Sequence, residues 1–383
     1  MGFDGRFAYA VGRIRALENR MIDQARFNRL IDSESPEELA RILGETEYGQ
    51  ASDVGPGRFE EIIDAELVRV HDLVAGMSPD PLLTGVFRAR HDFHNVKVYL
   101  KARLAARDRG IAAEVSSAAA SLGWFSPDQV GIIVDQVIGR ADELQEGHGA
   151  LLGGDAPARG VGPQLGSERG AALIGNERAT AGTAQLWAAL EGSAAIALSA
   201  YNEHGGDPQQ IDMASDRESF NYFYTVAKSR NAAFLESLIA EMADLTNILI
   251  SVRLRAIGKT AEFAANAFVP HGSLSVEWLA SAYAEPDEKF AIAFRATPYE
   301  RLVDEGLGQW RAGGSLAPFE NLVDSHLAAV AARSGGVPIG YEVVLGYLLA
   351  REAEADTLRR IFVGKMNRIP ASVIRERLCG AHA

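Results

Sequence analysis

The sequence predicts an all-α fold that is built from three similar helical units. Apolar residues recur at helical spacing along most of the chain, and no alternating pattern typical of β-strands runs for any length. One helical pattern occurs three times, and a capped helix start also returns three times, in the same order. Repetition of this kind is typical of a protein assembled from similar structural units.

The repeated pattern is a short amphipathic helix whose copies cover residues 92–104, 244–256 and 354–366. Each copy opens with an acid, has a small polar residue three places later and carries a base near its end. Apolar residues recur four positions apart, so each copy presents one apolar stripe. We interpret the acid and the base as partners for the opposite partial charges of the helix ends. The acids are Asp92, Asp244 and Glu354; the bases are Arg103, Arg255 and Lys365; the stripes are Val96, Leu100 and Leu104, then Ile248, Val252 and Ala256, then Leu358, Phe362 and Met366.

The chain begins with two predicted helices. Periodicity over 9–30 predicts one continuous helix, because the stretch contains no proline. Ser35 and Pro36 then form a typical helix start, in which Ser35 is the N-cap and Glu38 completes a capping box. We expect this second helix to end near Gly44.

The same succession of signals returns later in the chain. Capped helix starts recur at Ser126 and Ser275, each followed two places on by an acid. A helix expected to begin near Phe59 has a close counterpart that begins at Phe319. Because the order of the signals is kept as well as their type, we predict an internal repeat. Further matches are 46–48 with 297–299, and Asp64 with Asp212 and Asp324.

These matches divide the chain into three predicted units, 1–115, 116–262 and 263–383. The second unit is longer because it contains an insertion at about 139–192 that is rich in glycine and alanine. Closely spaced glycines and prolines disfavour regular structure. We therefore expect this insertion to form an irregular surface loop.

Composition limits the classes of function. The content, 47% hydrophobic and 23% charged, is ordinary for a folded soluble protein. A formal net charge of −13 argues against nucleic acid as a partner, because phosphate neutralisation requires concentrated positive charge. Cys379 is the only cysteine, so we expect neither an intrachain disulfide nor a cysteine-based metal site. We expect the protein to reside in a reducing compartment.

The sequence also predicts how the protein relates to membranes. The first residues lack the basic start and apolar run of a signal peptide. No apolar run approaches the roughly 18 to 20 residues that a membrane-spanning helix needs. We expect no transmembrane segment, and any association with a membrane would run through a partner that spans it.

No motif predicts a catalytic, cofactor-binding or metal-binding residue. The glycines of 160–166 lack the spacing and the preceding strand of a phosphate-binding loop. His91 and His94 lie three apart, but the other units have no matching histidines, and zinc needs three or four ligands. Cys379 lies close to the C-terminus, where chain ends are often mobile, so a nucleophilic role is not favoured.

Two sets of charged residues leave two interpretations each. The recurring acids, including Asp64, Asp212 and Asp324, could carry protons, but a threefold recurrence favours caps, dipole partners or polar links between helices. The basic run from Arg351 to Arg377 is either a solvated helical face or a docking surface for an acidic partner.

Several segments together resemble the C subunit of V/A-type ATP synthases, a family related to the d (AC39) subunit of vacuolar ATPases. The resemblance runs over most of the chain. It leaves out about 139–210, where the glycine-rich segment is unlike the helical middle of that family. The segments that carry the resemblance are 9–18, 39–49, 94–97, 269–275 and 365–378.

The resemblance implies an all-α, funnel-like protein of three similar units around a pseudo-threefold axis. It implies a non-catalytic central-stalk subunit that joins the soluble rotor shaft, made of D- and F-type subunits, to the membrane rotor ring of c- or K-type subunits. Such a peripheral subunit lies on the cytoplasmic side of the membrane, transmits torque for ATP-coupled proton or sodium transport, and needs no cofactor. The alternative is a soluble helical-repeat scaffold that binds protein or peptide partners.

Overall fold

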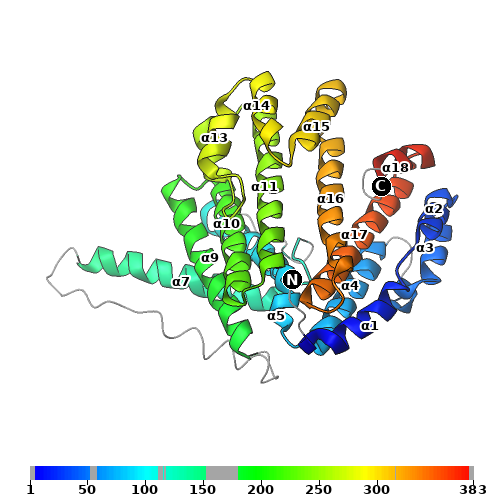
Figure 1. Ribbon diagram of the computed structural model, residues 1–383. Helices are drawn as coiled ribbons and strands as arrows, with labels where there is room; N and C mark the ends of the chain where they lie inside the picture. The colour runs from blue at the N-terminus through cyan, green and yellow to red at the C-terminus, as the bar shows by residue number, and fades with distance from the viewer. Residues whose placement is uncertain are drawn as a thin grey trace. The chain divides into compact units, whose positions relative to one another are not determined.

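The protein is all-α in a computed structural model that describes residues 5–51, 58–110, 115, 118–151, 180–314 and 316–378 (Figure 1). No β-strand occurs among these residues, which confirms the predicted fold class. The described helices are η1 (Gly5–Phe7), α1 (Ala8–Glu18), α2 (Gln24–Asp32), α3 (Pro36–Gly44), η2 (Glu47–Ala51), α4 (Phe59–Met77), α5 (Pro81–Thr84), η4 (Val86–Arg88), α6 (Ala89–Arg109), α7 (Pro127–Leu151), α9 (Thr180–Glu203), α10 (Pro208–Ser229), α11 (Ala233–Ala256), α12 (Ala261–Ala267), α13 (Val276–Ala284), α14 (Asp287–Ala293), η5 (Phe294–Ala296), α15 (Glu300–Gly313), α16 (Ala317–Ala332), η6 (Arg333–Gly336), α17 (Tyr341–Met366) and α18 (Ala371–Leu378).

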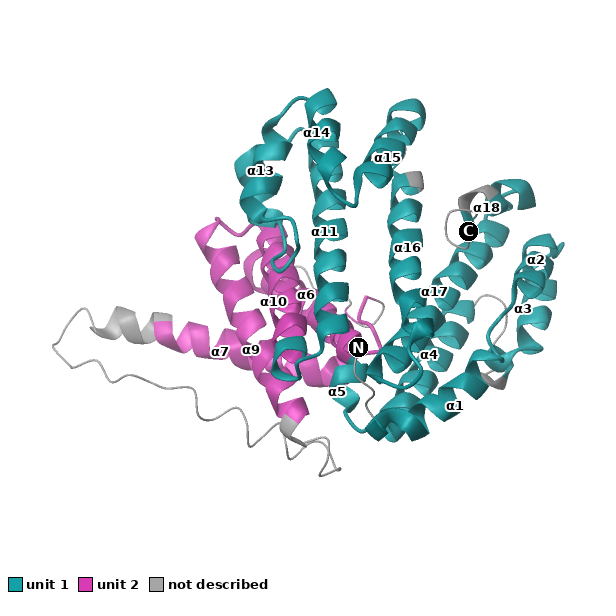
Figure 2. Ribbon diagram, in the orientation of Figure 1, with its two compact units in different colours: residues 1–85, 227–383 teal, residues 86–226 magenta. Residues whose placement is uncertain are grey.

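The helices form two compact units (Figure 2). Unit 1 contains residues 1–85 and 227–383, and unit 2 contains residues 86–226. Each unit has its own buried core and is described by itself. The division into three units at 1–115, 116–262 and 263–383, and their arrangement as a funnel around a pseudo-threefold axis, stay predictions.

All three copies of the repeated pattern are helical, as predicted, and each belongs to one of the long helices α6, α11 and α17. The interpretation of the opening acids as partners of a helix end is wrong for two copies. α11 begins at Ala233 and α17 at Tyr341, so Asp244 and Glu354 lie in the middle of their helices. These two carboxylates are buried and must find other partners, because an isolated buried charge is costly.

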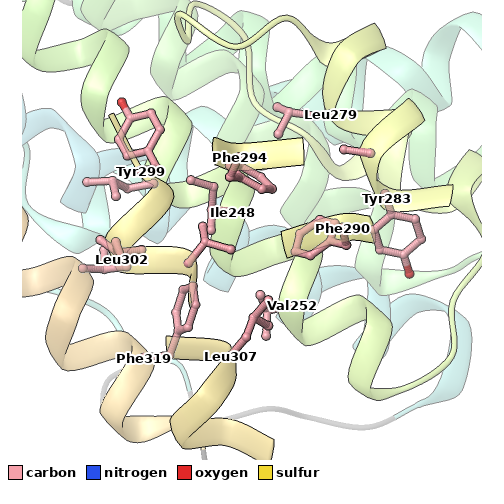
Figure 3. Close-up of a cluster of buried hydrophobic side chains, with 14 of the residues drawn as sticks. Ile248, Val252, Leu279, Tyr283, Phe290, Phe294, Tyr299, Leu302, Leu307 and Phe319 are labelled. Atoms are coloured by element: carbon pink, nitrogen blue, oxygen red, sulfur yellow. The ribbon is translucent and has the colours of Figure 1, made fainter. Parts of the chain in front are cut away.

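The apolar stripe of α11 contributes to one buried core of unit 1. Ile248 and Val252 are fully buried and point into a cluster of side chains from α12 to α16 (Figure 3). Phe319 at the start of α16 contributes a fully buried ring to the same cluster. Each buried side chain of this size contributes about 1.5–3 kcal/mol to folding. The helices that follow α11 in the chain thus pack against its C-terminal half.

The C-terminal half of α17 instead contacts helices from the beginning of the chain. Phe362 stacks on Phe59 of α4 with ring centroids 4.7 Å apart. Lys365 donates a hydrogen bond of 2.8 Å to the carbonyl oxygen of Ser33, just after α2. Arg375 of α18 forms an ion pair with Asp32 at the end of α2. The two ends of the chain therefore build one core, in which Leu358 and Phe362 of the α17 stripe are buried.

The single helix predicted over 9–30 is wrong, because α1 ends at Glu18 and α2 begins at Gln24. Asp23 caps the second helix by accepting the N–H of Arg26 at 2.8 Å. The N–H of Ile22 is taken by Glu354, from the other end of the sequence, at 2.6 Å. A cap and a distant carboxylate therefore replace the backbone bonds that a continuous helix would make.

The other predicted helix starts are confirmed. Ser35, Ser126 and Ser275 each accept an N–H from three residues later, at 3.2–3.3 Å. The carboxylate of Glu38 reaches back to the N–H of Glu34, one residue earlier than a standard capping box. Pro36 occupies the first turn of α3, which ends at Gly44 as expected.

Unit 2 is formed by α6, α7, α9 and α10. Phe125, just before α7, packs edge-to-face on Trp187 of α9. Lys101 of α6 forms an ion pair of 2.6 Å with Asp212 of α10. The irregular loop expected at about 139–192 is wrong at both ends, because α7 continues to Leu151 and α9 begins at Thr180. Residues 180–192 are rich in alanine, the strongest helix former, and residues 140–146 contain Arg, Ala, Glu, Leu and Gln, which also favour a helix. These preferences outweigh the cost of the nearby glycines; residues 152–179 lie outside the described part.

Candidate functional site, three buried carboxylate joints

The repeated acids form three joints in which a buried carboxylate on a long helix holds a loop by its backbone. In unit 1, Asp244 is fully buried and accepts the N–H groups of Ser273 at 3.1 Å and Leu274 at 2.9 Å. The hydroxyl of Ser273 donates to the same carboxylate. Tyr299 adds a fourth bond of 2.9 Å through its phenolic hydroxyl. The loop before α13 is therefore fixed to α11 by charge-assisted hydrogen bonds, which are stronger than neutral ones.

The second joint of unit 1 links α17 to the N-terminal segment. Glu354 accepts the N–H of Ile22 at 2.6 Å and the hydroxyl of Tyr48 at 3.0 Å. Its remaining charge is met by Arg351, whose guanidinium also binds Glu66 of α4 at 2.7 Å. Glu66, Arg351 and Glu354 are each about 2–3% exposed, so this network lies in the core between α17 and α4.

The third joint lies in unit 2. Asp92 is fully buried on α6 and accepts the N–H groups of Trp124 at 2.8 Å and Phe125 at 2.9 Å. Asn95, one turn later, exchanges two hydrogen bonds with the backbone of Ala120. Asn247 of α11 does the same with the backbone of Val269, so the asparagine has a shared role in these two copies. In the third copy, the hydroxyl of Thr357 donates to the carbonyl oxygen of Ala353 within its own helix.

A glycine admits the carboxylate in two of the joints. A side chain at Gly123 would overlap Asp92, and one at Gly272 would overlap Asp244. Glu354 meets a segment without such a glycine.

The closing base of each copy also reaches a neighbouring segment. Arg103 binds Asp135 of α7 at 2.8 Å, and Arg255 binds Asp287 at 3.1 Å. Lys365 reaches the backbone carbonyl oxygen after α2 instead. In the first two copies, the acid and the base thus hold the segment that follows at two points.

The tripeptides at 46–48 and 297–299, matched in the sequence, have the same structure. The hydroxyl of Thr46 donates to a carbonyl oxygen three residues back and accepts the N–H of Tyr48. Thr297 does both for Tyr299. This small turn aims each tyrosine at its carboxylate, a role that the sequence did not reveal.

Burial dominates the electrostatics of the joints. Desolvation raises the pKa of Asp92 from 3.8 to about 7, although two backbone N–H groups oppose the shift. Desolvation likewise raises the pKa of Glu354, against the attraction of Arg351. Burial and the adjacent carboxylates raise the pKa of Tyr48 and of Tyr299, so both remain hydrogen-bond donors at neutral pH.

The other recurring acids are polar links between helices, one of the roles predicted for them. Asp64 of α4 forms an ion pair with Arg359 of α17 at 2.6 Å. Asp324 of α16 pairs with Arg360 of α17. Asp212 is bound to α6 in unit 2. Most of the C-terminal basic run, including Arg359, Arg360, Lys365 and Arg375, is therefore engaged within the chain rather than presented to an acidic partner.

The structure does not bring other sequence candidates together. Nε2 of His94 lies 3.0 Å from the carbonyl oxygen of Ala118, and Nε2 of His91 accepts from Arg90. Within the described ranges, no three His, Cys, Asp or Glu residues group as a metal site would require. Cys379 and the glycines of 160–166 lie outside the described residues.

Unit 1 has an open cleft of about 680 Å³ near the beginning of α11. Arg230 on its wall is paired with Asp80 at 2.8 Å, and Tyr341 caps α11 by accepting the N–H of Phe234. No nucleophile with a base beside it lines this cleft. None of the described helices has an apolar stretch that would let it cross a bilayer.

Comparison with known proteins finds one family. The family model described as ATP synthase (C/AC39) subunit matches residues 10–130 and 183–377. The gap between the two matched segments contains most of the glycine-rich insertion.

Curated relatives match almost the whole chain. The C subunit of the A-type ATP synthase of Methanothermobacter thermautotrophicus is 25% identical over 383 residues, covering 97% of this chain and 87% of the relative. The C subunit of the A-type ATP synthase of Haloquadratum walsbyi is 23% identical, with 93% of each protein covered. The C subunit of the V-type sodium ATPase of Enterococcus hirae is 21% identical, with 95% of each covered.

Proposed function

The chain belongs to the ATP synthase (C/AC39) subunit family, and on that premise we propose that it is the rotor adaptor of a V/A-type ATP synthase or ATPase. It joins the soluble central stalk to the membrane rotor ring and transmits torque between them. The observation that carries this proposal is the family match, which spans both units and all three joints. The family is one of structural rather than catalytic subunits.

The construction of the joints supports a mechanical role. A torque-bearing protein needs elements that do not slide past one another under load. Interdigitated side chains resist such sliding, and protein cores are packed at close to crystal density. The buried carboxylates add directional bonds to the backbone of the loops, so that each short helix is fixed in register with its long helix.

The proposed partners follow from the family. They are D- and F-type subunits of the central stalk on one side and c- or K-type subunits of the membrane ring on the other. The chain would then be a peripheral component on the cytoplasmic side of the membrane. Proton or sodium transport would occur in the ring, and this protein would couple that transport to ATP.

Affinity purification of the tagged protein from gently solubilised membranes of its source tests the proposal. The expected result is recovery of stalk and ring subunits, with the ATPase head behind them, identified by mass spectrometry. Recovery of soluble proteins alone, with no part of an ATPase, would overturn the adaptor proposal and favour a helical-repeat scaffold.

A joint variant sharpens this experiment. Asp244→Ala removes the acceptor of four hydrogen bonds and should release the loop before α13. Arg253→Ala, on the exposed side of the same helix, is the matched control. If the adaptor must be stiff to assemble, the first variant should recover fewer ring subunits than the control does.

A further inference from the structure

The two joints of unit 1 occupy equivalent positions in the repeat, yet they use different ion pairs. Phe59 begins α4, and Phe319 occupies the matching position in the first turn of the equivalent helix α16; Glu66 and His326 each follow seven residues later. On the long helices, Arg351 and Glu241 each precede the joint carboxylate by three residues. The pair Glu66–Arg351 therefore corresponds to the pair His326–Glu241, with the acid and the base exchanged between helices.

The ion pair between Glu66 of α4 and Arg351 of α17 does not depend on pH in the physiological range. Arg351 and Glu66 are both 3% exposed at their side chains and lie 2.7 Å apart. A guanidinium does not lose its proton at physiological pH. Arg69 binds the other side of Glu66 at 2.7 Å, so the carboxylate stays paired throughout this pH range.

The α11–α16 pair contains a histidine in place of the arginine. Nε2 of His326 lies 3.3 Å from Oε2 of Glu241, and the two side chains are 27% and 18% exposed. Histidine is the side chain that ordinarily changes charge between pH 5 and 8. The same position in the fold thus carries a fixed ion pair in one joint and a titratable pair in the other.

The groups around His326 come from three neighbouring elements. Glu241 on α11 is shared with Arg333, which binds it at 2.8 Å from the end of α16. The ring of Tyr299, from the loop before α15, lies 5.8 Å from the imidazole and is itself bound to Asp244. From α17, Arg360 contacts α16 two residues earlier, at Asp324. Arg333 keeps Glu241 paired when His326 is neutral, so the proton on His326 is the quantity that changes.

We propose that the α11–α16 contact is a pH-responsive joint. Protonated His326 draws Glu241 into an ion pair and holds α16 on α11. Neutral His326 makes at most a hydrogen bond, and α16 opens more readily. The Glu66–Arg351 pair is insensitive over the same range, so of these two equivalent pairs only His326–Glu241 responds to acidification. The α4–α17 contact also contains buried His71, which lies 3.2 Å from Glu352 and outside the equivalent position.

Hydrogen–deuterium exchange of the full chain at pH 5.5 and pH 8.0 tests this proposal. After correction for intrinsic exchange rates, amides of α16 around His326 should be protected about two- to fivefold more at pH 5.5, the effect of a partly exposed ion pair. Glu241→Gln should abolish the difference in α16.

Arg333→Gln is the matched variant that keeps the proposal falsifiable. It removes the competing cation from Glu241, so the difference in α16 should persist or grow. Equal protection of α16 at the two pH values in the unmodified chain would overturn the proposal. An unchanged difference in Glu241→Gln would also overturn it, because it would point to a general effect of pH.

Discussion

At the residue scale, the recurring device is a buried carboxylate whose partners are backbone N–H groups of a distant loop. Asp92, Asp244 and Glu354 each lie on a long helix and each accept at least one N–H group just before the N-cap of another helix. Because these groups would otherwise be unpaired, each carboxylate satisfies both itself and the loop. Substitution at the joints should therefore cost more than loss of an exposed hydrogen bond.

The glycine of a joint should not tolerate a side chain. Gly272→Ala would overlap Asp244, whose carboxylate is held by four hydrogen bonds and has little freedom to yield. We expect a loss of about 1–3 kcal/mol in the free energy of unfolding, measured by urea denaturation. Gly12→Ala is the control, because an added Cβ at this exposed position of α1 meets no atom within 4 Å, and it should stabilise by about 0.5–1 kcal/mol.

The tyrosines of the two tripeptides should matter through their hydroxyl groups. Tyr299→Phe keeps the ring in the core and removes one donor to Asp244, so we expect a loss of about 1–3 kcal/mol in thermal or chemical denaturation. Tyr48→Phe should behave alike at Glu354. Tyr9→Phe, at an exposed position of α1, should leave the stability unchanged; a comparable loss there would argue against the joints.

Asp92 should make unit 2 sensitive to pH. Its folded pKa of about 7 lies above the ordinary value of 3.8, so the folded state binds the proton more tightly. The stabilisation from this group is fully present below about pH 4 and is lost as pH rises through 7, by up to about 4 kcal/mol. Urea denaturation of wild type and Asp92→Asn at pH 5.0 and 7.5 isolates the effect. At pH 7.5 the free energy of unfolding of wild type should exceed that of Asp92→Asn by less than at pH 5.0, or should fall below it. A difference that grows as the pH rises would contradict the raised pKa of Asp92.

At the scale of elements, unit 1 joins the two ends of the chain through a buried network. Arg351→Met would leave Glu66 and Glu354 buried without their common cation. Such a change typically costs about 3–5 kcal/mol, and hydrogen exchange should rise in α4 and α17 together. The control Arg253→Met removes an ion pair that is 54% exposed at the arginine and should cost less than about 1 kcal/mol.

Local signals were enough to predict most helices and their starts. The serine caps at 35, 126 and 275 are local because the side chain and its N–H partner lie three residues apart. The break between α1 and α2 was missed, because Asp23 lies inside an unbroken helical periodicity and its significance depends on Glu354, 332 residues from Ile22. The helical ends of the glycine-rich insertion were also missed, since alanine at one end and other helix-favouring residues at the other outweighed the nearby glycines.

The candidate site was predicted in part. The recurrence of the acids and of the Thr-x-Tyr tripeptides was visible in the sequence, and so was a structural role for the acids. Their partners were not visible, because almost every residue has a backbone N–H and the sequence does not show which of them a distant carboxylate will bind. The ion pair between Arg351 and Glu66 could not be predicted from the sequence either, since only the packing of α17 on α4 brings these residues together.

At the scale of the whole molecule, family membership and stiff helical construction point to a mechanical role. The long helices carry hydrogen-bonded joints at repeated positions, and many charged residues hold helices together. Under the proposed function, the chain couples the ATPase head to the membrane ring without catalysing a reaction itself.

ATP-driven ion uptake by membrane vesicles, measured with and without this protein, tests the proposed coupling between ATP hydrolysis and ion transport. Vesicles that lack the chain should keep ATP hydrolysis by the head and lose ion uptake. Adding back the purified protein should restore uptake in proportion to the amount bound. Ion uptake at the full rate in vesicles without the protein would contradict the account.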